Sequence, residues 1–214
     1  MANNYEILKS GSEGNCIILR DIIALDMGVP FSTVKPYLKQ LKIVFITHEH
    51  SDHLKKSTIK KLAFEKPSLA FCVGKHLVKH LIKCGVNPKK IYVLEPNRKF
   101  DLGAIIVEPF ELTHDVPNFG FKIIFKKDNY KTIYATDTSN MDNVVALDYD
   151  LYLVECDYNQ EELEQRILDK QQNNEYIYEF RAANTHLSEG QWADFMLNNA
   201  NANSECVKIH QHIS

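Results

Sequence analysis

The sequence lacks the features of membrane and disulfide-stabilised secreted proteins. No apolar stretch approaches the roughly 20 residues that a membrane span requires, and residues 1–6 lack the basic-then-apolar plan of a signal peptide. The five cysteines are odd in number and form no C-x-x-C pair, so free thiols are expected rather than a disulfide framework. These absences exclude an integral membrane protein and predict a soluble, cytoplasmic protein without a membrane partner.

Long linkers, internal repeats and low-complexity tracts are also missing. The chain has 214 residues, of which 44% are hydrophobic. A chain of this size can bury one sizeable core but not comfortably two independent ones. We therefore predict a single domain that spans residues 1–214.

Short segments rich in β-branched residues alternate with helical segments along the chain. Strands are expected at residues 5–8, 16–19, 22–25, 43–46, 69–73, 91–94, 105–112, 121–125, 132–135, 151–154 and 206–210. Helices are expected at residues 31–41, 57–64, 75–84, 161–170 and 189–199. This alternation predicts a layered α/β fold.

The densest chemistry follows the apolar run at residues 43–46. His48, His50, Asp52 and His53 place three imidazoles and a carboxylate within six positions. Such side chains are suited to Zn, Mn or Fe, and donors crowded onto the turn that leaves a buried strand converge without a large loop-closure cost. A lone histidine on an apolar face is usually a hydrogen-bonded core residue, but four donors at this density predict a metal site.

Positive charge is concentrated in residues 55–99. This segment holds twelve lysines and arginines against Glu65 and Glu95, a local balance of +10 in a chain whose net charge is −3. The concentration includes Lys55, Lys56, Lys60 and Lys61 directly after the metal motif, and Lys75, Lys79 and Lys83 at helical spacing. Such asymmetry is typical of a surface that faces a polyanion, and equally of solvated helix faces.

The H-x-H-x-D-H spacing at the end of a predicted strand resembles the metallo-β-lactamase fold superfamily. The resemblance implies an α/β fold of four layers, the αββα sandwich, in which two mixed β-sheets are flanked by helices. It also implies two divalent metal ions, most often zinc, with manganese or iron accepted by the same donors.

The resemblance extends to further donors in the expected order, each at a strand end. His114 resembles the third ligand of the first ion, Asp137 the bridging carboxylate and His212 the last ligand of the second ion. The first ion would then be held by His48, His50, His114 and Asp137, and the second by Asp52, His53, Asp137 and His212. Asp115 is an alternative to His114, His210 is an alternative to His212, Asp137 could instead cap a helix, and Cys156 could neighbour the ions.

Two ions placed in this way make a nucleophilic hydroxide from a bridging water at neutral pH and clamp the oxygens of a phosphoryl group. His186 stands where the phosphodiesterase branch carries a non-ligand histidine, so we expect it to be a general acid or a phosphate clamp. Asp52 is grouped with His186 as catalytic. Lys55, Lys56 and Ser188 are the expected substrate contacts, although Ser188 is equally suited to cap the following helix.

The His-x-Ser pairs at residues 186–188 and 212–214 resemble the nucleic-acid-cutting branch of the superfamily, which includes the transfer RNA 3′-end-processing nucleases. The nearer likeness is to the YycJ-type (WalJ) exonucleases, carried by the loop at residues 10–16 and the segments 136–138 and 154–156. Within the last segment, Glu155 would orient a ligand histidine or His186, or be an ordinary strand-end carboxylate. Glu13 and Thr185 depart from the small residue and the glycine usual at those positions.

Three functions follow as hypotheses. The first is a metal-dependent phosphodiesterase that acts on DNA or RNA, with nucleic acid as substrate. The second is a small-molecule hydrolase that acts on a thioester, lactone, lactam or cyclic nucleotide. The third, a non-catalytic metal or redox protein, lacks a visible flavin-binding or electron-transfer segment in this chain.

Overall fold

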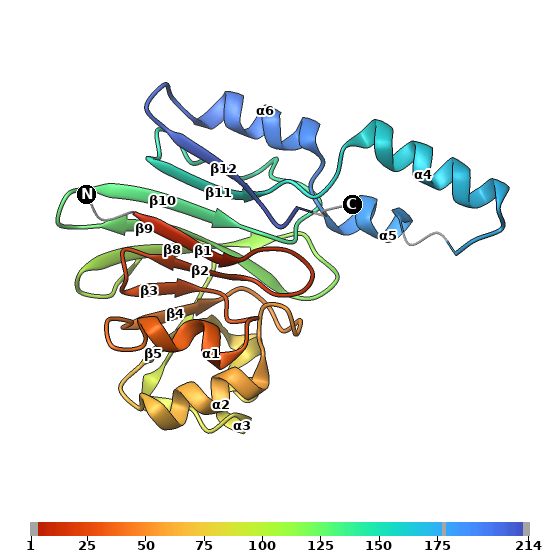
Figure 1. Cartoon of the computed structure of the whole chain (residues 1–214). Helices are drawn as coiled ribbons and strands as arrows, with labels where there is room; N and C mark the ends of the chain where they lie inside the picture. The colour runs from red at the N-terminus through yellow and green to blue at the C-terminus, as the bar shows by residue number, and fades with distance from the viewer. Residues whose placement is uncertain (1–3, 177–178, 212–214) are drawn as a thin grey trace. The chain divides into compact units, whose positions relative to one another are not determined.

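The computed structural model describes residues 4–176 and 179–211. The chain divides into two compact units, Met1–Glu95 and Pro96–Ser214. Each unit contains one six-stranded mixed sheet with flanking helices, which confirms the predicted fold class (Figure 1). The assignment of residues 1–214 to a single domain stays a prediction.

The first unit builds its sheet in chain order, β1-β2-β3-β4-β5-β6. Strands β1 to β3 pair antiparallel, and β3 to β6 pair parallel. The strands are β1 (Tyr5–Lys9), β2 (Cys16–Leu19), β3 (Ile23–Leu25), β4 (Ile43–Ile46), β5 (Ala70–Gly74) and β6 (Ile91–Leu94). The helices are α1 (Phe31–Val34), α2 (Lys56–Glu65) and α3 (Val78–Lys83), with short 3-10 turns η1 (Lys35–Tyr37), η2 (Lys75–Leu77) and η3 (Pro88–Lys90).

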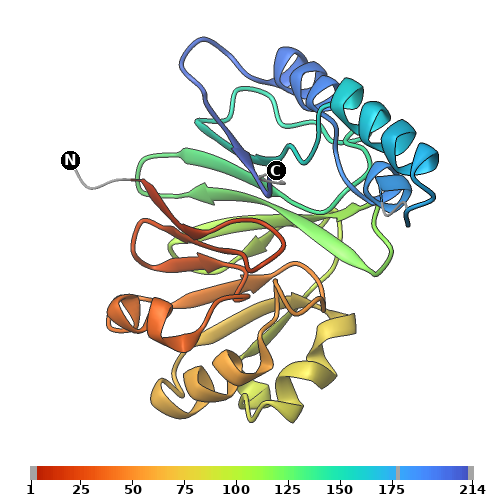
Figure 2. The same ribbon diagram turned by 45° about the vertical axis from the view of Figure 1, so that its right-hand side comes forward.

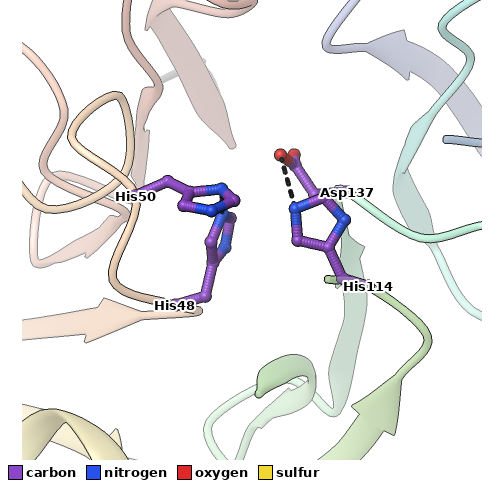
Figure 3. A group of neighbouring side chains, drawn as sticks. All are labelled: His48, His50, His114 and Asp137. Atoms are coloured by element: carbon purple, nitrogen blue, oxygen red, sulfur yellow. Dashed lines mark hydrogen bonds and ion pairs between the residues drawn. The ribbon is translucent and has the colours of Figure 1, made fainter. Parts of the chain in front are cut away.

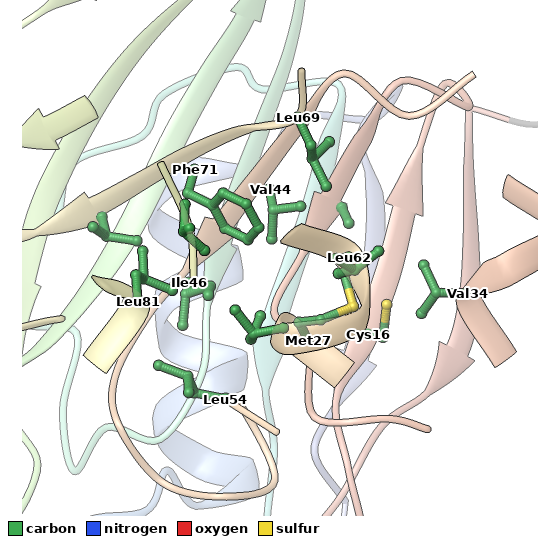
Figure 4. Packing of buried hydrophobic residues seen from close by; sticks show 14 of the residues in the cluster. Cys16, Met27, Val34, Val44, Ile46, Leu54, Leu62, Leu69, Phe71 and Leu81 are labelled. Atoms are coloured by element: carbon green, nitrogen blue, oxygen red, sulfur yellow. The ribbon is translucent and has the colours of Figure 1, made fainter. Parts of the chain in front are cut away.

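The helices of the first unit lie along one side of its sheet, where alternate strand residues form a common apolar face (Figures 1 and 2). Ala24, Val44 and Phe71 are register partners on neighbouring strands and share this face. Ile59 and Leu62 of α2 pack into the same cluster, which Figure 4 draws at close range. Each such buried side chain stabilises the fold by about 1.5 to 3 kcal/mol, so the cluster holds the carboxyl end of β4 in place.

The second unit has the strand order β12-β11-β10-β9-β8-β7. Strands β7 to β10 pair antiparallel, whereas β10, β11 and β12 pair parallel. The strands are β7 (Phe100–Asp101), β8 (Ile105–Leu112), β9 (Asn118–Phe125), β10 (Tyr130–Ala135), β11 (Leu151–Glu155) and β12 (Glu205–Ile209). The helices are α4 (Gln160–Gln172), α5 (Glu179–Thr185) and α6 (Glu189–Asn199).

Helix α6 covers the core of the second sheet. Phe195 and Met196 of α6 pack with Ile133 of β10 and with Tyr152 and Val154 of β11. The Tyr152 hydroxyl donates to the Asn199 carbonyl oxygen at 2.8 Å, so the ring's polar end is satisfied inside the core. This packing fixes the ends of β10 and β11, from which Asp137 and Glu155 project.

The helix expected at residues 31–41 is wrong in length. The structure has four α-helical residues followed by the 3-10 turn η1, which contains Pro36. Proline has no backbone N–H to donate to the carbonyl four residues earlier and its ring crowds that turn. The α-helix therefore ends before it. Strand β7 and helix α5 were not predicted.

Two predicted absences can be compared with the structure. In the described part of the chain, every helix falls short of the length and apolarity needed to cross a bilayer. All five cysteines are free, and four of them are buried. The prediction of free thiols is confirmed.

Candidate metal centre

In the first unit, a carboxylate buried under the metal motif organises the loop after β4. The Thr47 backbone N–H donates to Asp26 Oδ1 at 2.9 Å, and its hydroxyl reaches both carboxylate oxygens at 3.0 Å. Asp26 directly follows β3, has a left-handed backbone (φ 57°) and is fully buried. A buried carboxylate needs several donors to offset its lost hydration, and this loop supplies them.

Asp26 also orients His53. Its Oδ2 lies 2.7 Å from His53 Nδ1. A carboxylate at Nδ1 favours the tautomer that carries its proton there, which leaves the lone pair on Nε2. On that side lie Asn15 Nδ2 at 2.9 Å and Asp52 Oδ2 at 3.3 Å. His53 is therefore held as metal ligands commonly are, with one nitrogen anchored and the other beside a second donor.

His48 and His50 form the other half of the motif (Figure 3). Thr47 Oγ1 lies 2.9 Å from His48 Nδ1, and His48 Nε2 lies 3.1 Å from His50 Nδ1. The two rings meet edge to face with centroids 4.7 Å apart. These nitrogens converge because the residues between them point elsewhere: Glu49 pairs with His80 of α3 at 3.0 Å. Glu49 thus points away from the donors, as alternation predicts.

Gly28 permits the close approach of the loop that carries these donors. Its N–H donates to the Asn15 carbonyl oxygen at 2.9 Å. A Cβ at Gly28 would lie 1.6 Å from the backbone carbonyl oxygen of Asp52, so a side chain can fit only if the ligand loop moves.

Gly28→Ala is therefore expected to lower the free energy of unfolding by about 3 kcal/mol. It should also reduce metal content, because the loop with Asp52 and His53 must shift. Urea unfolding and metal analysis measure the two effects. Gly190→Ala is the matched control: its Cβ would meet only Ser188 Oγ at 4.0 Å, and alanine in α6 should add up to about 1 kcal/mol. Equal effects of the two changes would contradict this account.

In the second unit, His114 and Asp137 lie together after β8 and β10. His114 Nε2 is 3.7 Å from Asp137 Oδ2, the pair that Figure 3 joins with a dashed line, and His114 Nδ1 donates to the Thr185 carbonyl oxygen at 3.2 Å. Burial lowers the pKa of His114, and the charges of Asp137 and Asp115 oppose this only in part. A neutral imidazole with an anchored Nδ1 is the form that binds metals.

Asp137 is held in a strained and well-supported backbone. Its φ is 55°, a left-handed value that aspartate and asparagine adopt more easily than most residues. The Thr136 hydroxyl donates to Asp137 Oδ1 at 2.7 Å, and the Asn118 amide donates to the backbone carbonyls of Thr136 and Asp137. Asp137 does not cap a helix, so that alternative is wrong. Its carboxylate instead lies beside the imidazoles of His114 and His210.

Asp115, the alternative to His114, has a different set of partners. Arg181 Nη2 donates to Asp115 Oδ2 at 2.6 Å, and Asp115 Oδ1 lies 3.2 Å from His114 Nε2. A carboxylate already paired with a guanidinium is a weaker metal donor, because its charge is partly neutralised. The contacts therefore favour His114, with Asp115 beside it.

Glu155 and His186 form a pair in which the carboxylate is fully buried and the imidazole is partly exposed. Glu155 Oε1 lies 2.7 Å from His186 Nδ1 and accepts from the Leu187 N–H at 3.0 Å, while Oε2 accepts from the Thr138 N–H at 2.9 Å. Burial raises the pKa of Glu155 to about 7. Burial opposes charge on His186 as well, but the hydrogen bond and charge of Glu155 outweigh it and raise the pKa of His186 to about 9. The contact with Glu155 thus favours the protonated form of His186.

His210, the alternative to His212, lies beside the bridging carboxylate. It follows β12, and its Nδ1 is 3.3 Å from Asp137 Oδ1. Its ring stacks on that of His186 with centroids 5.3 Å apart and an interplanar angle of 15°. His212 lies outside the described residues.

Paired variants decide between the two histidines. His210→Ala is expected to remove a donor next to Asp137 and to reduce the amount of metal bound per chain. His212→Ala should leave the metal content unchanged. Metal analysis after gel filtration measures both. The reverse pattern, with loss of metal only in His212→Ala, would return the assignment to His212.

The donor sets of both units fit divalent metal ions. Unit 1 offers His48, His50, Asp52 and His53, and unit 2 offers His114, Asp137 and His210, all of them nitrogen and oxygen donors suited to Zn, Mn or Fe. Within unit 2, the donor atoms of Asp137, Glu155 and His186 lie within 4.8 Å of one another. Cys156 is in none of the donor groups formed by the described residues, and burial raises the pKa of its thiol. Cys156 is therefore poorly suited to bind a metal.

The predicted substrate contacts lie on two helix starts. Lys55 is the residue before α2 and Lys56 is its first residue. Ser188 caps α6: its hydroxyl accepts from the Gln191 N–H at 3.3 Å in a reciprocal capping box. The capping alternative is thus observed, and substrate binding by these three residues stays a prediction.

Two residues that support the motif were missed by the sequence analysis. Asp26 holds Thr47 and His53, and Asn15 lies against His53 Nε2. One feature of the sequence could have pointed to Asp26. It is a carboxylate that directly follows an apolar strand, and Asp137 follows its own strand at almost the same distance. Asn15 carried none beyond its place in the loop at residues 10–16.

Comparisons with known proteins agree with these features. The family model "Beta-lactamase superfamily domain" matches residues 23–202. Exodeoxyribonuclease WalJ of Streptococcus pneumoniae is 29% identical over 179 residues, which cover 73% of this chain and 63% of that protein. The chain thus spans less than two thirds of that relative.

Two solved structures show the fold. The metallo-β-lactamase fold protein YhfI from Bacillus subtilis superposes with a TM-score of 0.73 at 16% identity, over 98% of this chain and 87% of its own. Human tRNase Z, short form, superposes with a TM-score of 0.70 at 17% identity, over 97% of this chain and 92% of its own. The family match covers most of the chain, including the ligand loop, His114 and Asp137. On these grounds the chain belongs to the β-lactamase superfamily and has the metallo-β-lactamase fold.

Proposed function

We propose that this protein is a metal-dependent phosphodiesterase that cleaves DNA or RNA. The observation that carries the proposal is the Glu155–His186 pair beside Asp137, which adds a proton donor to a set of metal ligands. Hydrolysis of an unactivated phosphodiester needs such a donor, because its alkoxide leaving group is strongly basic. The similarity to a protein named exodeoxyribonuclease supports the same substrate class.

The proposed centre uses the donors of both units. The first ion would be held by His48, His50, His114 and Asp137, and the second by Asp52, His53, Asp137 and a histidine after β12. When bound, the two ions would supply a nucleophilic hydroxide at neutral pH and neutralise the phosphoryl oxygens. Membership of the superfamily and the donor chemistry in each unit support this assignment.

The remaining residues position donors and move a proton. Asp26 fixes the tautomer of His53. Glu155 favours a proton on His186 Nδ1. The other ring nitrogen of His186, Nε2, would donate its proton to the leaving oxygen or to a phosphate oxygen. Asp52 Oδ2 lies 3.3 Å from His53 Nε2, so Asp52 and His53 offer their donor atoms side by side. Lys55 and Lys56, at the start of α2, are the proposed contacts for the substrate phosphates.

A panel of small substrates separates this function from the runner-up, a small-molecule hydrolase. Metal-loaded protein is offered a thymidine phosphodiester, a cyclic nucleotide, a thioester, a lactone and a lactam at equal concentration. We expect kcat/KM to be highest for the linear phosphodiester by at least about tenfold. A thioester, lactone or lactam turned over faster than the phosphodiester would replace the proposal with the small-molecule function.

A further inference from the structure

A basic groove in the first unit begins at Lys55 and continues along α2, away from the ligand loop. It is an open hollow of about 740 Å³ between α1 and α2. Four lysines and one glutamate line it: Lys35, Lys55, Lys60, Lys61 and Glu65. The described parts of the chain contain no ion pair made by any of the four lysines. Their charge is therefore available to a ligand.

The groove side of α2 carries exposed lysines and an exposed aromatic ring, and the opposite side is buried. Lys60, Lys61 and Phe64 lie on one face because residues three and four apart are neighbours on a helix. Ile59 and Leu62 face the core. Across the groove, Phe31 of α1 lies under Lys61, whose Nζ is 5.7 Å from the ring centroid. This cation–π contact fixes one ammonium group at the groove wall.

Phe64 is the most unusual residue of this surface. Its side chain lines the groove, yet the residue is 83% exposed. A large ring left in water costs free energy unless a ligand covers it. A row of ammonium groups beside an exposed aromatic ring is the combination that binds single-stranded nucleic acid, in which phosphates meet cations and an unpaired base stacks on the ring.

The groove is connected to the ligand loop within the same unit. Lys55 lines the groove and stands two residues after His53, and its N–H donates to the Met27 carbonyl oxygen at 3.0 Å. Helix α2 has ten residues, a length of about 15 Å. At about 3.4 Å per nucleotide of a stacked strand, the groove side of α2 spans roughly four nucleotides.

We propose that this groove binds the single-stranded segment of a nucleic acid substrate, with phosphates on Lys35, Lys60 and Lys61 and one base stacked on Phe64. The inference deepens the proposed function, because it assigns the path of the polymer leading to the ligand loop. It is independent of turnover, because binding can be measured without cleavage.

The test is equilibrium binding of a fluorescein-labelled 12-nucleotide single strand to the full chain, followed by anisotropy over a series of salt concentrations. Neutralising Lys35, Lys60 and Lys61 together with glutamine should weaken binding at least tenfold. It should also lower the slope of log K against log salt by about 2, because each phosphate contact on a single strand contributes about 0.7. The matched control replaces Lys75, Lys79 and Lys83 with glutamine, which removes the same charge from the same unit and should change binding less than threefold.

Phe64→Ala tests the stacking part of the inference. We expect roughly tenfold weaker binding with an unchanged salt slope, because a stacked base is lost while the phosphate contacts stay. Phe64→Tyr should bind like the original protein. Thermal unfolding of each variant shows whether a loss of binding reflects a loss of folding. Because the substituted side chains are exposed, we expect unchanged unfolding temperatures.

Several outcomes would overturn the inference. Equal weakening by the two triple variants would mean that the whole basic segment, and not the groove, attracts the strand. Competition by poly-glutamate as effective as that by DNA would mean that the surface binds an acidic protein. Cleavage of DNA that is unaffected by the groove variants would keep the proposed function and remove the groove from it. Groove-dependent binding without cleavage, by contrast, would support the groove inference and contradict the proposed nuclease function.

Discussion

Asp137→Asn is expected to abolish metal-dependent phosphodiester hydrolysis, with kcat/KM lowered at least about 10³-fold. Asp137 is the residue whose carboxylate lies near both His114 Nε2, at 3.7 Å, and His210 Nδ1, at 3.3 Å. Asparagine keeps the shape and tolerates the left-handed backbone at this position. The change therefore removes a negative charge and little else, and metal analysis should show fewer than two ions per chain.

The matched control for this variant is Asp115→Asn. Asp115 is a neighbouring carboxylate in the same unit, is paired with Arg181 at 2.6 Å and lies 3.2 Å from His114 Nε2. Loss of its charge should change kcat/KM less than tenfold and keep two ions. If Asp115→Asn lost metal and Asp137→Asn retained it, Asp115 and not Asp137 would be the metal ligand. His48→Ala should behave like Asp137→Asn, because it removes a buried donor from the motif.

His186→Ala is expected to retain its metal ions and to lower kcat by about 10² to 10⁴. His186 is held by Glu155 at 2.7 Å and stacks on His210, so its loss removes a proton donor rather than a ligand from the proposed centre. The effect should depend on the leaving group. An ester that releases p-nitrophenolate needs little protonation and should lose less than tenfold, whereas a nucleotide ester should show the full loss.

The comparison of leaving groups distinguishes a proton donor from a structural residue. Loss of a structural residue would slow the hydrolysis of both substrates equally. Asn184→Ala is the control, because Asn184 is exposed and its amide donates to the Phe180 carbonyl oxygen within α5. Loss of metal from His186→Ala would make His186 a ligand. Full turnover of the nucleotide ester would remove it from the mechanism.

The ends of the strands were the part of this molecule most open to prediction. Strand β4 has the expected bounds, and the ligand motif follows it, because a buried apolar run and a dense set of donors are both local in sequence. The α/β class and most elements follow from the same local periodicity. Pro36 shows where periodicity fails: the apolar pattern continues to Leu41, but the missing N–H ends α1 earlier.

Contacts between distant residues could not be predicted in this way. Asp26 lies 27 positions before His53, and nothing in the sequence joins them until β3 and β4 pair in parallel register. Glu155 presented two interpretations, and only the 2.7 Å contact to His186 Nδ1 favours the orienting one. Alternation along the predicted last strand would put His210 and His212 on one face, so the sequence alone did not distinguish them. The contact between His210 and Asp137 comes from the turn after β12.

The most direct test of the central claim is cleavage of end-labelled single-stranded DNA and RNA by metal-stripped protein, resupplied separately with Zn²⁺ and Mn²⁺. We predict strand cleavage that requires added metal and is absent from Asp137→Asn under the same conditions. The fragment ladder then reports the direction of cutting. Intact polymers under both metals, with two ions bound per chain, would contradict the assignment of a nuclease.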